Sequence, residues 1–227
     1  MNFRSNGFDE KLEFLSGLSS SSANQIDVLL WDWLHHFLIN TDLSEIFSLI
    51  QSRVLYVFPR TARLHVVGVS VKEDIVKALI PFSNFEEINT TAMVDTAYQT
   101  LYIHSWGNEM LVPITNSQVL ATLDIQAVTN FLFEDQAVSL TFSAPAKMSG
   151  LLFYLECEID GEEWAFSTRD SDVYEQPLII LRHPIDGLPQ QVVTGLIGRK
   201  SANSLSVKLT NPNSADHIDA KFRLPVL

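Results

Sequence analysis

Residues whose side chains most often carry chemistry are sparse in this sequence, which has six histidines and a single cysteine. No histidine pair has H-E-x-x-H spacing, and the adjacent His35 and His36 would point about 100° apart on a helix. One cysteine permits neither a disulfide within the chain nor a cysteine-based metal cluster. His65 and His104 fall on predicted strands, and they would share a cavity with Asp95 if those strands were neighbours. We expect no bound metal and no cofactor.

Motifs for nucleophilic catalysis are also absent from the sequence. It contains no G-x-S-x-G, no S-x-x-K with supporting partners and no glycine-rich phosphate loop. "GLIGRK" at 195–200 combines two glycines with two basic residues, but no helical pattern follows, so we attribute it to turn chemistry, with an anion contact as the alternative. Nothing singles out a general acid and base among the 27 Asp and Glu residues. The sequence therefore predicts a protein that is not an enzyme. The alternative is an enzyme whose site the sequence does not reveal.

Aromatic residues supply the candidate ligand site. Tyr102 and His104 lie two residues apart on a predicted strand and therefore share one of its faces. Trp106 lies in the turn that follows the strand. Phe82 and Phe85 precede the strand in a polar, irregular segment. We predict that these five side chains line a small-molecule pocket, because ligand pockets are commonly lined by aromatic side chains together with a few polar groups. The alternative is that they fill the core.

The elements that position these residues follow from the spacing of apolar side chains. Residues 24–37 and 42–58 have the i, i+3, i+4 pattern of amphipathic helices, and Pro59 ends the second. Trp31 lies off the apolar face of the first helix, so we predict it at a protein interface, with ordinary burial as the alternative. The pattern then predicts a strand at 62–70, a helix at 73–80, irregular chain at 82–93, a strand at 97–105, a hairpin at 109–126 with its turn at 116–117, and a helix at 131–142.

The pattern changes near residue 148. Two strands flank the dipeptide at 160–161, an Asp-Gly hairpin signal, and further strands are predicted at 177–182, 190–198, 203–210 and 217–224. About six strands without a helix indicate a small antiparallel barrel or sandwich. We therefore predict a flexible segment at 1–22, an α+β domain at 23–147 and an all-β domain at 148–227.

Three motifs carry a family resemblance. "LVPI" at 111–114 resembles the hydrophobic-Val-Pro-hydrophobic strand of GAF domains, and "QVLATLDIQ" at 118–126 resembles the strand after it, with Ala121 where the family often has glycine. "FLFEDQAVSLTF" at 131–142 resembles the closing helix of that family. Residues 24–145 are thus similar to a GAF or PAS-like domain. The resemblance implies an antiparallel sheet flanked by helices that dimerises or senses a small molecule. A core without cysteine excludes the family's bilin attachment and its methionine-sulfoxide reduction.

Composition limits the class of partner. The chain is 46% apolar with a formal net charge of −12, so it folds, and its acidity works against binding to nucleic acid. It has no signal peptide and no run of 18 apolar residues, and its lone cysteine suits a reducing compartment, so we expect a cytoplasmic protein without membrane insertion. We predict a non-enzymatic regulatory or adaptor protein in signalling, whose GAF-like domain dimerises or senses a small molecule and whose β domain contacts another protein. The alternative is a structural or assembly accessory subunit built on a ligand-free GAF-like scaffold.

Overall fold

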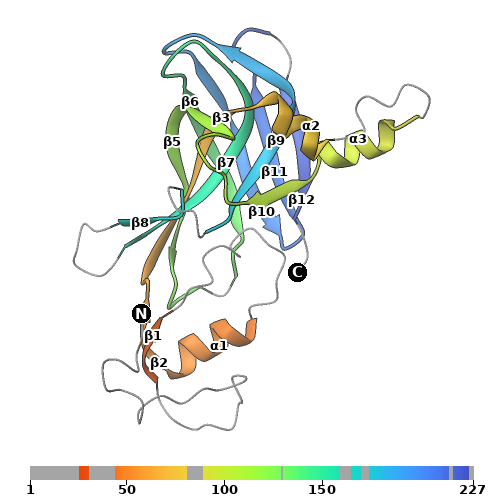
Figure 1. The fold of residues 1–227 in the computed structure, drawn as a ribbon. Coiled ribbons are helices and arrows are strands. Elements are labelled where there is room, and N and C mark those ends of the chain that lie inside the picture. Colours follow the sequence, from red (N-terminus) through yellow and green to blue (C-terminus); the bar gives the residue numbers. More distant parts are fainter. Residues whose placement is uncertain are drawn as a thin grey trace.

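The computed structural model describes residues 26–30, 44–80, 89–128, 130–158, 165–169, 174–214 and 217–224. Most of them lie in strands, accompanied by three short helices, α1 (Ser44–Arg53), α2 (Glu73–Leu79) and α3 (Thr91–Tyr98). The strands form two large sheets and a small third one (Figure 1). None of the described helices is long and apolar enough to cross a membrane.

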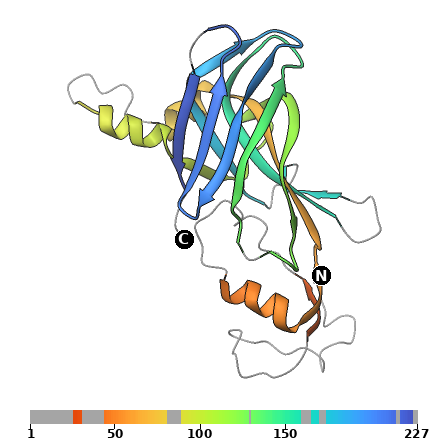
Figure 2. The same ribbon diagram turned by 180° about the vertical axis from the view of Figure 1, so that it is seen from behind.

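The two large sheets are antiparallel throughout. The first has the order β4 (Leu101–His104), β9 (Gln176–Gly187), β7 (Ala146–Glu158), β3 (Thr61–Val71) and β5 (Leu111–Asp124), with β8 (Ala165–Ser167) beside β7. The second has the order β12 (His217–Arg223), β11 (Ser204–Thr210), β10 (Val192–Ser201) and β6 (Phe133–Thr141). Figure 2 shows this second sheet from its own side, with the blue C-terminal strands lying next to a green one.

One seam between the two sheets is closed by side-chain amides. The Oδ1 atom of Asn116 in β5 accepts a hydrogen bond from Thr141 N in β6 at 2.6 Å. Two residues on, Gln118 accepts from Ser139 N at 2.6 Å and donates to Ala137 O at 2.8 Å. An amide side chain carries both a donor and an acceptor, so it can replace a backbone peptide group in a ladder. These two residues therefore attach β5 to β6 where the strands have separated.

The opposite seam joins β12 to the chain just before β4. Thr100 forms a parallel bridge with Arg223, and Arg223 N donates to Gln99 O at 2.8 Å. With both seams linked, the two sheets close into a barrel, an arrangement that leaves few unpaired edges.

The first large sheet is buried on both faces. Toward the barrel interior, Leu64 and Val66 of β3 join Phe153 of β7 in a large apolar cluster that also contains residues of the second sheet. On the outer face, Val67 and Val69 belong to a second cluster that α2 and residues of β4 help to cover. A strand buried on both faces carries apolar residues at successive positions, as β3 does from Val66 to Val69.

A small parallel sheet lies beside the barrel and consists of β1 (Ile26–Leu30) and β2 (Val54–Phe58). Helix α1 precedes β2 and buries Phe47 and Ile50 in the main core, where the Phe47 ring meets Phe131 edge-on at 5.2 Å. This N-terminal unit is therefore packed onto the barrel by apolar contacts.

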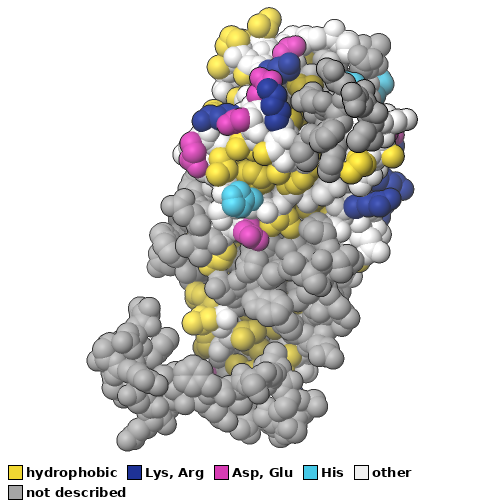
Figure 3. Space-filling view, turned by 45° about the vertical axis from the view of Figure 1, so that its right-hand side comes forward, with side chains coloured by type: hydrophobic (Ala, Val, Ile, Leu, Met, Phe, Trp, Pro, Cys, Tyr) yellow, Lys and Arg dark blue, Asp and Glu magenta, His cyan; other side chains and the backbone are white. Residues whose placement is uncertain are grey.

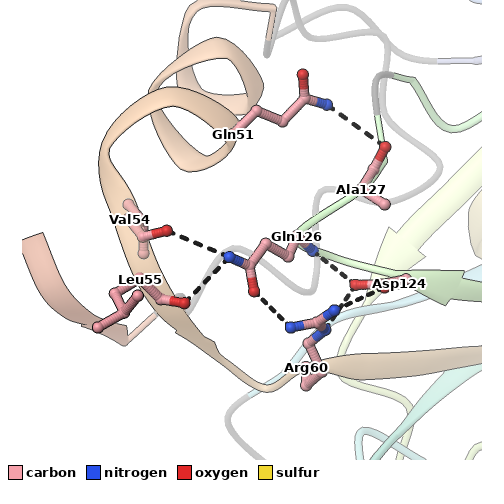
Figure 4. A network of polar contacts seen from close by, with 7 residues as sticks. All are labelled: Gln51, Val54, Leu55, Arg60, Asp124, Gln126 and Ala127. Carbon is pink, nitrogen blue, oxygen red and sulfur yellow. Dashed lines mark hydrogen bonds and ion pairs between the residues drawn. The ribbon is translucent and has the colours of Figure 1, made fainter.

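A polar network also ties the N-terminal unit to the end of β5 (Figure 4). Arg60 holds the Asp124 carboxylate through two nitrogens, at 2.8 and 2.9 Å, and also donates to the side chain of Gln126. Gln126 in turn donates to the backbone carbonyls of Val54 and Leu55 at 3.2 and 3.1 Å. The Arg60 contacts lower the pKa of Asp124, chiefly through the hydrogen bond that the guanidinium donates. The network thus fixes the start of β2 against the barrel.

The predicted fold class, α+β with a GAF-like sheet flanked by helices and a separate all-β domain, is wrong. The chain is predominantly β, and the segment 131–142, predicted as the closing helix, contains β6. Its pairing with β10 places Val138 and Leu140 in the core, and this pairing outweighs the local helical pattern. The division predicted between 147 and 148 falls inside β7, and both large sheets combine strands from either side of it.

Several local predictions are also corrected. Residues 26–30 and 54–58, predicted within helices, are strands, because short apolar runs rich in valine and aromatic residues suit either structure until a partner strand is present. The hairpin predicted at 109–126 is one long strand without a turn at 116–117, since those polar residues serve the seam with β6. The strand predicted at 97–105 is shorter and follows α3. The segment 1–22 lies outside the described residues.

The sequence did predict β3, α2 and the C-terminal strands β9 to β12 near their observed positions. The pairing of β7 with β8 across the Asp-Gly signal is confirmed as well.

Candidate functional site

Helix α3 stands out from the body of the protein (Figure 1). None of its residues is buried, and Met93 is 48% exposed. Contact with the second apolar cluster is made by its C-terminal part, through Val94, Ala97 and Tyr98. A helix without a buried face gains little from packing on its own chain, so α3 is a candidate surface for another protein.

Contacts at the base of α3 hold it in this projecting position. The single proton of the Tyr102 hydroxyl is shared between the carbonyls of Ala97 and Leu79, at 2.9 and 3.2 Å, which connects the ends of both helices to β4. Asp95 forms an ion pair with Arg182 of β9. Burial, and then the neighbouring Tyr98, raise the pKa of Tyr102, so its hydroxyl stays a donor. The helix is thus held at its base by polar contacts while its first turn remains exposed.

The side of the molecule that bears α3 has a partly apolar surface. Figure 3 turns this side forward and shows hydrophobic side chains gathered in a band across the described surface, with basic side chains beside acidic ones above it. Apolar surface of this kind is a common feature of protein contacts.

The predicted ligand pocket is brought together only in part. Tyr102, His104 and Trp106 lie on one segment, and the His104 and Trp106 rings meet edge-on at 5.2 Å. Trp106 is buried, and its indole N–H donates to the carbonyl of Gln176 at 2.7 Å. Phe82, Phe85 and the predicted interface residue Trp31 lie outside the described residues. A ligand bound between these aromatics therefore stays a prediction.

The buried side chain of Gln176 organises the segment around Trp106. Its Oε1 accepts from Trp106 N at 2.9 Å, and its Nε2 donates to Thr168 O and Tyr174 O at 2.6 and 2.7 Å. A buried amide needs its donors and acceptor satisfied, and here the protein supplies the partners. Sequence reasoning missed this residue because its partner Trp106 lies 70 residues away along the chain.

A second polar group lies on the outer face of the first large sheet, around His65. Its Nδ1 is 3.0 Å from Ser117 Oγ, and its ring stacks on Tyr154 at 4.9 Å. Tyr154 donates its hydroxyl to Ser117 at 2.6 Å, and the Arg169 guanidinium lies over the Tyr154 ring. His65 Nε2 is 3.1 Å from a Glu156 carboxylate oxygen, but it lies off the direction of a hydrogen bond, so this contact is mainly electrostatic.

Burial lowers the pKa of His65, the Glu156 carboxylate acts against this shift, and Arg63 adds to it. The imidazole is therefore neutral at pH 7, with the Ser117 hydroxyl on one ring nitrogen. Ser117, His65 and Glu156 contact one another in sequence, as the members of a catalytic triad do. The Ser117 oxygen, however, also accepts a hydrogen bond from the Tyr154 hydroxyl. The Ser117 and Tyr154 hydroxyls are therefore paired within the group, whereas His65 Nε2 has only the electrostatic contact with Glu156. The sequence indicated only His65, because Ser117 lay in a predicted turn.

His65 and His104 do not meet. Their strands, β3 and β4, are separated in the sheet by β7 and β9. No cluster of three metal-ligating side chains occurs within the described ranges. Cys157 is buried, and desolvation raises its thiol pKa to about 12, which leaves it unreactive near neutral pH.

Comparison with known proteins gives a fold. No family model matches the sequence, and no curated protein matches it. The structure is similar to a chain of the Trypanosoma brucei PRMT1 enzyme-prozyme heterotetrameric complex with AdoHcy, with a TM-score of 0.74. The match covers 97% of this chain and 77% of that chain, at 17% sequence identity.

At this identity the likeness establishes the fold alone. It overturns the GAF-like fold and the function built on it, a sensing or dimerising GAF-like module joined to a separate β domain. The ligand-free GAF-like scaffold falls for the same reason. No family model tests the GAF resemblance of the sequence motifs itself, but the fold expected from it is not the one observed.

Proposed function

We propose that this protein is a non-catalytic subunit that acts by binding another protein chain through α3. The observation that carries the proposal is a projecting helix without a buried residue, held at its base by Tyr102 and by the ion pair of Asp95 with Arg182. Such a helix gains its main apolar contacts from a partner.

The partner we propose is a chain of the same fold. The similar structure belongs to a complex described as an enzyme-prozyme heterotetramer, in which chains of more than one kind associate. A role without catalysis is supported by the described polar groups, since the Ser117 hydroxyl is occupied by Tyr154 and the Cys157 thiol is buried. Association of two copies of this chain is the second candidate, favoured by the same exposed helix.

The proposal is tested by charging the exposed face of α3. Tagged full-length protein is expressed in cells of its source, and complexes purified through the tag are compared for wild type, Met93→Glu and Leu188→Glu. Leu188 is a matched control because it is also an exposed apolar residue, at 60% against 48% for Met93, but it lies between β9 and β10. Met93→Glu is expected to reduce the recovered partner about tenfold, since a charge buried in an apolar contact is costly.

Recovery with Leu188→Glu is expected to equal that of wild type. Partner recovery unchanged by Met93→Glu, with native circular dichroism, would contradict the role of α3. A small-molecule ligand and a cytoplasmic location also remain predictions for this protein.

A further inference from the structure

The parallel pair β1–β2 is unusually small for a sheet of its kind. In the described part of the chain, β1 has β2 as its one paired neighbour. Parallel sheets are normally covered on both faces and built from more strands, because their strands are apolar on both sides. The pair reaches the main core on both faces, through Leu29 and Val57 on one face and through Val54 on the other.

The rest of the pair presents apolar side chains to solvent. Val28 and Tyr56 are partners in the register and are 54% and 56% exposed, and Leu30, on the same face as Val28, is 75% exposed. These three side chains leave roughly 300 Å² of mainly apolar surface uncovered, which is the size of the largest patch on many monomers.

Within the described residues, the sequence of β1 lacks the usual protection of an edge strand against pairing. Natural edge strands carry lysine, proline or a bulge that prevents another strand from adding to them. β1 has the sequence Ile-Asp-Val-Leu-Leu, with neither lysine nor proline, and its register with β2 shows no bulge. Its one charge, Asp27, is exposed.

We propose that the outer edge of β1 is a docking site for an extended apolar segment of a partner protein, which adds to β1 as a third strand. Two arguments select this occupant. A second copy of the chain would need roughly 800 Å² on each side for a stable contact, well above the roughly 300 Å² present, whereas a strand also gains main-chain hydrogen bonds. Asp27 is the only charge in β1 and β2, so it favours a lysine or arginine on the incoming strand, and the net charge of −12 acts in the same direction.

This site is separate from α3, so the two proposals can fail independently. The probe is a fluorescein-labelled peptide in which four alternating valine and isoleucine residues are flanked by lysines. Its binding to the full-length protein is followed by fluorescence anisotropy. The same peptide N-methylated at alternate residues is the control, because it keeps the side chains and loses half of the backbone donors.

We expect saturable binding of the unmethylated peptide and at least about tenfold weaker binding of the methylated one, since strand addition depends on backbone hydrogen bonds. Leu30→Lys is expected to weaken binding about tenfold or more, by removing an apolar contact and repelling the lysines, and Leu188→Lys is expected to leave it unchanged. Amide exchange at residues 26–30 should slow when the peptide is bound.

Absence of saturable binding, equal binding of both peptides, or equal binding to Leu30→Lys and wild type would each overturn the proposal. Dimerisation of the protein abolished by Leu30→Lys, without peptide binding, would also overturn it and would assign this face to a second copy.

Discussion

Replacing Gln118 with alanine tests whether side-chain amides close the barrel between β5 and β6. The Gln118 side chain makes two hydrogen bonds across this seam, from Ser139 N and to Ala137 O. Each contributes about 0.5–1.5 kcal/mol net. Because both bonds lie near solvent, water can replace part of the loss, so we expect Gln118→Ala to reduce the free energy of unfolding by about 1–2 kcal/mol.

The matched control is Gln136→Ala. Gln136 lies on β6, and among the described residues its side chain bonds to Glu134, two residues away on the same strand. Its replacement should change the free energy of unfolding by less than about 0.5 kcal/mol. Adding Asn116→Ala to Gln118→Ala should deepen the loss, since Asn116 also spans the seam to Thr141.

The assay is urea unfolding followed by tryptophan fluorescence and circular dichroism. Since both large sheets combine strands from the two halves of the chain, we expect one transition that moves to lower urea without splitting. A stability of Gln118→Ala equal to that of Gln136→Ala would refute the role of the amides. Two separate transitions, of which only one moves, would refute the closed barrel.

Three further predictions concern the linkage of the N-terminal unit and two buried groups. Gln126→Ala removes the hydrogen bonds to the Val54 and Leu55 carbonyls, so amide exchange in β2 should accelerate while that in β7 does not; equal acceleration in both would contradict a local linkage. The pKa of His65 is lowered in the folded protein, so on acidification the unfolded chain binds a proton at a higher pH than the folded protein does. The free energy of unfolding should therefore fall as the pH drops below the ordinary pKa of 6.5. His65→Gln should lose less stability than wild type between pH 7 and 5.5 in urea unfolding, and equal losses would argue against this contribution. Cys157, with a pKa of about 12, should resist iodoacetamide at pH 8 in the folded protein and react after unfolding, whereas rapid labelling of the native protein would contradict its burial.

The sequence allowed the C-terminal strands to be predicted because each is bounded by turn residues and has a pattern that suits only a strand. β3 was predicted for a related reason, because its sequence is rich in β-branched residues. In these segments the local preference and the tertiary partners agree.

The predictions failed where the partner strand decides the structure. Residues 133–141 have apolar positions that suit a helix, but β10 and the side chains of Asn116 and Gln118 require a strand there. The same two residues looked like turn residues, because a polar pair between apolar runs usually marks a hairpin. Their bonding to β6 depends on contacts 19 to 25 residues away along the chain, which local patterns do not reveal.

The candidate site was predictable only near Tyr102. From the sequence, Tyr102, His104 and Trp106 could be assigned to one segment of the candidate site. The sequence did not indicate that the Tyr102 hydroxyl anchors α3. Nor did it indicate that α3 is a helix, because residues 91–98 straddle the irregular chain and the strand that the pattern predicted there. The proposed function rests on the absence of any fully buried residue in α3.

The most direct test of the proposed function is the native mass of the protein purified from its source. The chain alone has a mass of 25.5 kDa. A subunit that acts through α3 predicts a larger mass that contains a second chain of different sequence and falls to 25.5 kDa for Met93→Glu. A wild-type mass of 25.5 kDa at physiological concentration would contradict the account.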